Sequence, residues 1–165
     1  MNKKQVFWLF TLSALLLIPV FSLAIAMLPE PHVYASAGLP SDRIVRTDTE
    51  VELLPPKSDD YGNGAFTYTI YNQSQVTYRY LMEGGVIEVL QNDTWFTLKE
   101  LRELQPGDWD TGNLLPGELD WGIVFSYETL YGLLPAGHYR VLNQVWPIGY
   151  FDQAFWVALE FDVTE

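Results

Sequence analysis

From residue 44 onward the chain shows no sustained helical periodicity, and its apolar residues recur instead in short segments that end at turn residues. The clearest segment is 155–163, FWVALEFDV, in which every second residue from Phe155 to Val163 is apolar. A two-residue period is typical of a strand that buries one face. Repeated over many short segments, it predicts an all-β sandwich or barrel built from antiparallel strands.

The chain contains no cysteine, so the fold has no disulfide and must be stabilised by its core alone. The same absence excludes thiolate catalysis, iron–sulfur clusters and zinc sites that use cysteine. Residues 44–165 are enough to bury such a core, because aromatic residues make up 15% of the whole chain. We therefore expect a single disulfide-free domain in this range.

The first 26 residues have the pattern of a secretory signal peptide. Lys3 and Lys4 precede an almost wholly apolar run, and small residues at 24–26 or 35–37 offer cleavage sites. The alternative is an uncleaved membrane anchor, because the run is just long enough to span a bilayer core of ~30 Å. Either interpretation places the folded domain outside the cytoplasm, secreted or anchored at the cell surface.

Residues 27–43 are rich in Pro, Ala, Ser and Gly and lack periodicity, which predicts a flexible linker between the N-terminal segment and the domain. The formal net charge of the chain is −12. Such a surface repels a phosphate backbone, which excludes nucleic acid as a partner. Anionic headgroups are disfavoured for the same reason, so we expect membrane contact only through an uncleaved N-terminal segment.

The segment LPAGHYR predicts how the chain passes between two sheets. In immunoglobulin-like sandwiches a tyrosine near the start of the sixth strand bonds its hydroxyl to backbone a few residues upstream. Leu134, Gly137 and Tyr139 occupy the positions of that corner, with Gly137 expected to supply an unusual backbone shape. The simpler alternative is an ordinary turn before a strand. The corner predicts an immunoglobulin-like antiparallel β-sandwich of about seven to eight strands.

The order of several short motifs adds a family resemblance. The motifs are Asn72-Gln73-Ser74, Tyr78 to Tyr80, Trp95 to Leu98, Leu134 to Arg140 and Glu160-Phe161. In this order they resemble the bacterial immunoglobulin-like domain family of exported proteins, from about Glu50 to the C-terminus. The resemblance implies the sandwich fold and an extracytoplasmic location. It implies no chemistry, because such sandwiches host many functions.

No residue pattern points to catalysis. His138 is the only histidine after the linker, it lies in the corner turn, and no nucleophile-elbow sequence accompanies it. Glu160 and Asp162 share one face of the last segment, where solubility explains them better than a role in glycoside hydrolysis. We expect a non-enzymatic domain without a cofactor.

The segment from Asp108 to Asn113 begins like a calcium-binding loop, with carboxylates at its first and third positions, Asp108 and Asp110. Asn113 and Leu119 stand where the sixth and twelfth positions of a helix–loop–helix site need Gly and Glu. Asp108 and Asp110 are therefore weak candidates, and we predict no metal site.

Aromatic residues in expected loops are the remaining candidates for binding. Trp109 lies in a polar loop, and Trp146, Tyr150 and Phe151 cluster between two expected strands. Exposed rings anchor protein partners or stack on sugars. The favoured alternative is that this loop folds over an open end of the sandwich and buries its rings.

These observations predict an extracytoplasmic immunoglobulin-like module for protein interaction or structural support at the cell surface. The alternative is a carbohydrate- or small-ligand-binding domain that uses the loop aromatics. A small hydrolase is a third hypothesis, which requires a concave pocket with two close carboxylates.

Overall fold

The computed structural model describes residues 33–56, 64–82, 85–102 and 110–164. The predicted signal peptide, Asp108 and Trp109 lie outside these residues. Over the described ranges, no helix has both the length and the apolar character needed to cross a membrane.

The described residues are almost entirely extended, as the two-residue periodicity predicts. Two short helical segments occur among them, α2 (Glu128–Tyr131) and the single 3₁₀ turn η1 (Phe151–Gln153). The strands are β1 (Ala37–Pro40), β2 (Val51–Leu54), β3 (Phe66–Asn72), β4 (Tyr78–Leu81), β5 (Val86–Gln91), β6 (Thr94–Leu98), β7 (Thr111–Leu114), β8 (Leu119–Phe125), β9 (Gly137–Pro147) and β10 (Phe155–Val163).

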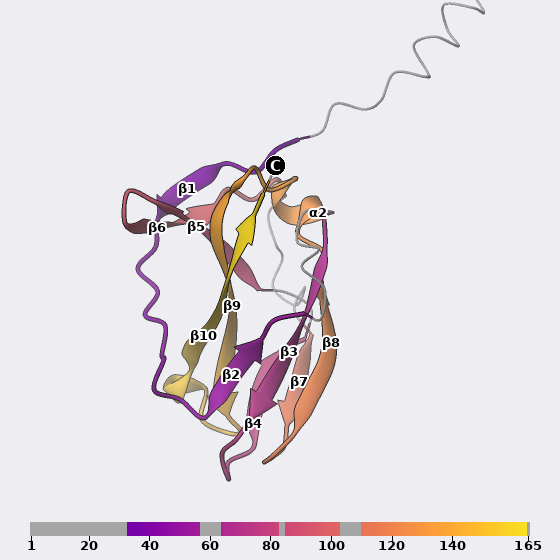
Figure 1. The fold of residues 1–165 in the computed structure, drawn as a ribbon. Helices are drawn as coiled ribbons and strands as arrows, with labels where there is room; N and C mark the ends of the chain where they lie inside the picture. The colour runs from indigo at the N-terminus through magenta and orange to yellow at the C-terminus, as the bar shows by residue number, and fades with distance from the viewer. Residues whose placement is uncertain (1–32, 57–63, 83–84, 103–109, 165) are drawn as a thin grey trace, which may run out of the picture. The chain divides into compact units, whose positions relative to one another are not determined.

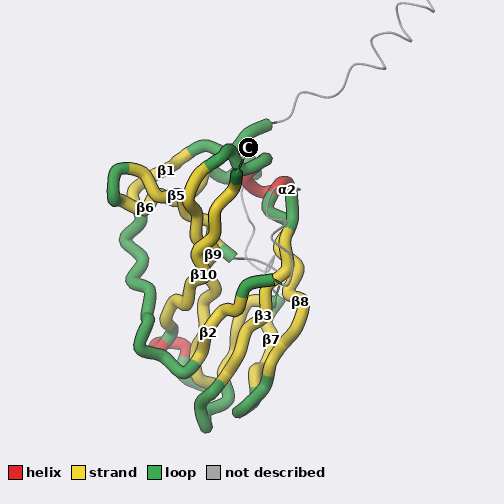
Figure 2. Tube along the Cα trace, in the orientation of Figure 1, coloured by secondary structure: helices red, strands yellow, loops and turns green. Residues whose placement is uncertain are grey.

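These strands form two antiparallel sheets that pack as a sandwich (Figures 1 and 2). The smaller sheet has the order β2-β3-β8. In the larger sheet, the order is β1-β6-β5-β9-β4-β7, and β10 also pairs with β9. β10 pairs with one edge of β9, and β4 and β5 pair with successive stretches of the other edge. Together, β4 and β5 therefore occupy the position of one interrupted strand. The fold is the disulfide-free immunoglobulin-like sandwich predicted from the sequence.

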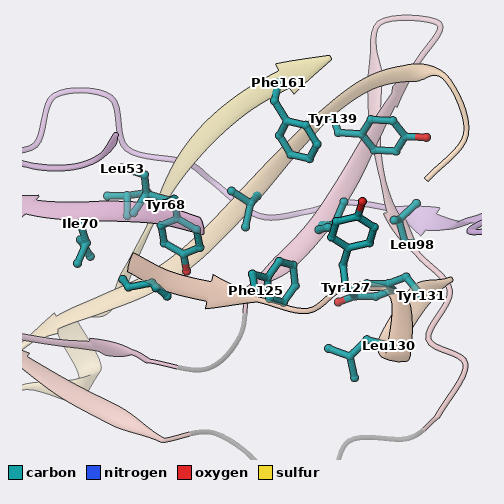
Figure 3. Packing of buried hydrophobic residues seen from close by; sticks show 14 of the residues in the cluster. Leu53, Tyr68, Ile70, Leu98, Phe125, Tyr127, Leu130, Tyr131, Tyr139 and Phe161 are labelled. Carbon is teal, nitrogen blue, oxygen red and sulfur yellow. The ribbon is translucent and has the colours of Figure 1, made fainter. Parts of the chain in front are cut away.

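The core between the sheets follows the predicted alternation. In β10, Phe155, Val157, Phe161 and Val163 are buried, and Glu160 and Asp162 lie on the opposite, exposed face. Several fully buried rings fill the space between the layers, among them Tyr68, Tyr127 and Tyr131 (Figure 3). Burial of so many large rings supplies much of the stabilisation that a domain without disulfides needs.

The linker predicted over residues 27–43 differs from the structure in its second half. β1 pairs with β6, with Ala37 opposite Leu98 and Pro40 opposite Phe96. The small residues suggested a linker, but here they allow close approach: a Cβ added at Gly38 would lie 2.9 Å from the backbone oxygen of Thr97. The described domain therefore includes residues 33–43.

The number of strands also exceeds the predicted seven to eight among the described residues. Hydrophobic alternation did not reveal β1, because its contacts are made by backbone groups at the edge of β6. The division of one long strand into β4 and β5 adds a further element.

The chain crosses from the smaller sheet to the larger one between β8 and β9, at the predicted corner. The Tyr139 hydroxyl donates a hydrogen bond to the Pro135 carbonyl oxygen at 2.7 Å. The Tyr139 ring is buried beside Phe161, with ring centroids 5.8 Å apart, and Leu134 is buried as well. Gly137 does not have a positive φ. It provides space instead, because a Cβ there would lie 3.1 Å from the Tyr139 ring.

Replacing Tyr139 by phenylalanine is expected to lower the free energy of unfolding by about 1 kcal/mol, because the Pro135 carbonyl loses its donor while the ring still packs. Urea denaturation measures the change. Tyr150→Phe is the matched control, since the Tyr150 ring is exposed. Equal stability of the two variants would contradict a stabilising role of the corner.

Candidate functional site in the loops at one end of the sandwich

Three loops meet at the end of the sandwich where β9 turns back into β10, drawn at the bottom of Figure 1. They are the β3–β4 turn (73–77), the β7–β8 loop (115–118) and the β9–β10 loop (148–154). The Ile148 amide donates to the Thr77 carbonyl oxygen at 3.2 Å, and the Gly117 amide donates to the Asn72 carbonyl oxygen at 2.8 Å. Backbone hydrogen bonds thus connect all three loops.

A single buried amide holds two of these loops in place. The Asn72 Nδ2 group donates to the carbonyl oxygens of Val76 at 2.8 Å and of Leu114 and Leu115 at 3.1 Å. Its Oδ1 atom accepts from the Ser74 amide at 3.0 Å and the Ser74 hydroxyl at 2.7 Å. Asn72 is fully buried. One side chain therefore fixes the β3–β4 turn against the β7–β8 loop.

These fixed loops expose large apolar side chains, which we name the end patch. Each member has between 45% and 63% of its surface exposed. The members are Val76, Leu115, Ile148, Tyr150 and Phe151. Large apolar groups gathered on one surface mark interaction sites more often than apolar residues scattered singly do.

The predicted aromatic residues divide between exposed positions on these loops and one buried position in β9. Tyr150 and Phe151 are exposed, whereas Trp146 is 8% exposed. The Phe151 ring lies edge-on to Trp146, with centroids 5.2 Å apart and an interplanar angle of 81°. Trp146 thus packs against the Phe151 ring and is itself too buried to contact a partner. Trp109 lies outside the described residues.

Val76 and Leu115 were not singled out from the sequence, because Val76 is a lone apolar residue in a polar turn and Leu115 lies between Leu114 and Pro116 with no alternation to mark its exposure. The available signal was Asn72-Gln73-Ser74, one of the motifs that carry the family resemblance. The structure gives this segment a physical role, the bonding of the carbonyls of Val76, Leu114 and Leu115 by Asn72.

Of the two weak calcium candidates, Asp110 is exposed and Asp108 lies outside the described residues. Residues 111–114 would have to curl around an ion, but they extend as β7 and pair with β4. In the described part of the chain, no group of three or more His, Asp or Glu side chains is arranged to hold a metal ion.

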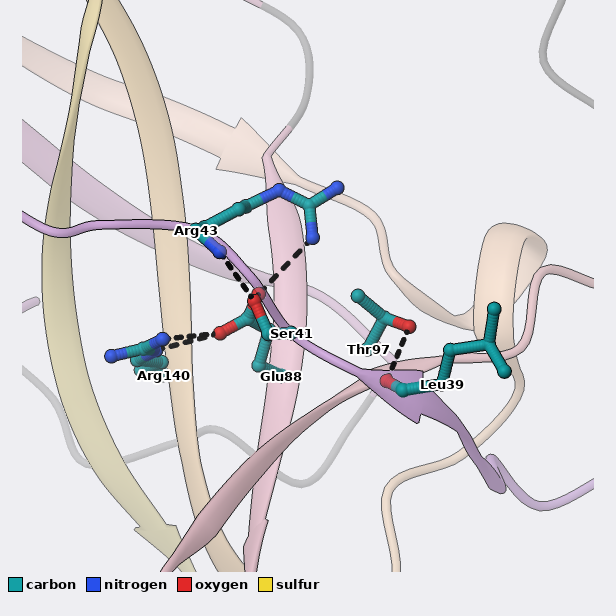
Figure 4. Close-up of polar contacts among 6 residues, drawn as sticks. All are labelled: Leu39, Ser41, Arg43, Glu88, Thr97 and Arg140. Carbon is teal, nitrogen blue, oxygen red and sulfur yellow. Dashed lines mark hydrogen bonds and ion pairs between the residues drawn. The ribbon is translucent and has the colours of Figure 1, made fainter.

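A buried ionic cluster lies on the outer face of the larger sheet (Figure 4). The Glu88 side chain is fully buried, and its Oε2 atom accepts from Arg140 Nε and Nη2 at 2.8 and 2.6 Å. Its Oε1 atom accepts from Arg43 Nη1 at 3.1 Å and from the Ser41 hydroxyl. The Arg140 guanidinium also lies 4.3 Å from the Trp95 ring centroid. These contacts hold residues 41–43 against the sheet.

His138 lies on the same outer face and is bonded on both sides. Its Nδ1 atom is 2.7 Å from Asp162, and its Nε2 atom is 3.1 Å from Glu160. Hydrogen bonds to Asp162 and then Glu160 raise the His138 pKa above its ordinary value. The ring also lies against Trp95, with centroids 5.7 Å apart. This arrangement links β9 to β10 across the sheet surface.

The comparisons with known proteins show no family for this chain. No family model matches the chain, and no curated protein matches it. Among solved structures, it is similar to the ASH / PapD-like domain of human CEP192 (PapD-like domain 7) at 11% identity, with a TM-score of 0.33. The match covers 80% of this chain and 95% of that chain. The immunoglobulin-like sandwich is therefore established from its own sheets, and membership of the bacterial exported family stays a prediction.

Proposed function

We propose that the protein is a non-enzymatic, extracytoplasmic interaction module that binds a protein partner through the end patch. The observation that carries this proposal is the exposure of apolar side chains on three loops that hydrogen bonds hold together, two of them through the buried Asn72 amide and the third through the bond from Ile148 to Thr77. Loops already held in one conformation lose little entropy on binding. Aromatic side chains such as Tyr150 and Phe151 commonly supply most of the energy of a protein interface.

The position of the end patch in the domain suits display to a partner. The described chain begins at Val33, whose carbonyl accepts from the Leu133 amide, and ends just after Val163, which pairs with Gly137. Both contacts lie near the start of β9, whereas the end patch follows its last residue. β9 has 11 residues, which corresponds to a length of about 33 Å. Within the domain, the end patch thus lies at the opposite end from Val33 and Val163.

Glycan binding is the second candidate, because the Tyr150 and Phe151 rings are adjacent in the chain and both exposed. Aromatic rings stack on sugars as well as on protein side chains. The aliphatic members of the end patch, Val76, Leu115 and Ile148, favour an apolar protein surface over a hydroxyl-rich glycan.

The double variant Tyr150→Ser/Phe151→Ser is expected to weaken retention of protein partners by about tenfold or more, because two anchoring rings are lost. Quantitative pull-down with the full chain from the producing cells measures this. Val124→Ser is the matched control, because Val124 is 57% exposed on β8, outside the end patch.

Equal retention of the same partners by the double variant and the control would contradict the proposal. Loss of binding on a glycan array, with protein partners unaffected, would favour the second candidate.

Protease treatment of intact cells tests the location, since an extracytoplasmic domain is cleaved without lysis.

A further inference from the structure

We infer that the partner of the end patch is a different protein whose apolar contact surface is bordered by lysine or arginine, and not a second copy of this chain. The inference rests on the proposed function and specifies the chemistry of the partner. It follows from the charges that surround the end patch.

Acidic residues adjoin each of the three loops that carry the end patch. The Gln73 amide donates to the Glu50 carbonyl oxygen at 2.7 Å, and Gln73 Nε2 donates to Glu52 Oε1 at 2.6 Å, so both glutamates adjoin the β3–β4 turn. Glu118 Oε2 accepts from the Leu115 amide at 2.6 Å within the β7–β8 loop.

Asp152 directly follows Phe151 in η1 and is exposed. We name the four carboxylates the acidic rim. The acidic rim consists of Glu50, Glu52, Glu118 and Asp152.

Two basic residues of the described chain lie near this end, and both are engaged with other groups. Arg79 Nε donates to Asn113 Oδ1 at 3.4 Å, and the Arg46 guanidinium lies 4.9 Å from the Phe155 ring centroid. The carboxylates of the acidic rim outnumber these two cations. The surroundings of the end patch are therefore negative, in keeping with the charge of the whole chain.

This charge disfavours association of two copies through the end patch. A symmetric dimer places the same surface of each copy against the other. The two acidic rims would then lie against each other, and the net charge of −12 on each chain would add to the repulsion. A partner that carries basic residues around an apolar surface removes this cost and gains favourable electrostatic steering.

Selection from a phage-displayed library of random 15-residue peptides against the immobilised full chain tests the inference. We expect enriched peptides to combine aromatic or aliphatic residues with flanking Lys or Arg. Their affinity should fall about tenfold between 50 and 300 mM NaCl, because salt screens the rim. Glu50→Gln/Asp152→Asn should weaken binding about threefold or more, and Tyr150→Ser/Phe151→Ser should abolish it.

Asp42→Asn/Asp93→Asn is the matched control, because it removes the same charge from exposed positions outside the acidic rim. One result would overturn the inference and leave the proposed function intact. In it, the enriched peptides need Tyr150 and Phe151 but carry no basic residues, and their affinity does not change with salt or in the Glu50→Gln/Asp152→Asn variant. A library with no peptide sensitive to Tyr150→Ser/Phe151→Ser would contradict both. A dimer seen by sedimentation equilibrium and lost in that variant would establish self-association instead.

Discussion

Replacing Glu88 by glutamine is expected to lower the free energy of unfolding by about 3–5 kcal/mol. The Glu88 side chain is fully buried between the Arg140 and Arg43 guanidiniums, and Arg140 alone makes two hydrogen bonds to it. Glutamine has a similar shape but no charge. The two arginines would then lie against the sheet with no compensating carboxylate, and an uncompensated buried charge is among the costliest defects in a folded protein.

Chemical denaturation with a constant m-value measures this loss. Glu52→Gln is the matched control: it makes the same substitution in a strand, but Glu52 is exposed, so a change below about 0.5 kcal/mol is expected. Similar losses in the two variants would show that the cluster contributes no more than a surface charge.

A second measurement separates the two arginines. The Arg43 side chain is 27% exposed, so Arg43→Ala should cost less than Glu88→Gln while leaving the Arg140 pair intact. Because Ser41 and Arg43 both bond Glu88, each variant should expose residues 41–46 to limited proteolysis. Unchanged cleavage in both variants would mean that the backbone bonds of the segment, from Ser41 to Trp95 and from Arg46 to Trp156, hold it without the cluster.

The layered architecture could be predicted from the sequence because it depends on local patterns. Alternation in residues 155–163 identified the buried face of β10, since a period of two puts Phe155, Val157 and Phe161 on one side. The corner was also visible, because Leu134, Gly137 and Tyr139 lie within a few residues of each other. Both features need only short-range information.

The features that were missed depend on segments that are distant in the chain. Glu88 resembles the solvent-facing residue of an ordinary strand, and its burial requires Arg43 and Ser41 to lie across the outer face. The end patch likewise joins three separate turns, with Val76 and Leu115 brought together through Asn72. No periodicity within one segment contains this information, which is why the sequence pointed to Trp109 and to the aromatic residues near Trp146, and not to Val76 or Leu115.

Replacing Asn72 by alanine is expected to lower the free energy of unfolding by about 3 kcal/mol or more, because several buried backbone groups lose their partner at once. The carbonyl oxygens of Val76, Leu114 and Leu115 lose a donor, and Ser74 loses its acceptor. Denaturation measures the loss. Asn113→Ala is the matched control, since Asn113 is exposed on β7 and accepts a single bond at 3.4 Å.

The Asn72→Ala variant also tests whether the end patch depends on fixed loops. Hydrogen exchange should rise in residues 73–77 and 115–118, which Asn72 connects, and less in residues 148–154, which are held by the backbone bond from Ile148 to Thr77. Partner affinity should then fall although Tyr150 and Phe151 are unchanged, because the variant must order its loops on binding. Unaltered affinity in a folded Asn72→Ala protein would show that the two rings bind without support from the neighbouring loops.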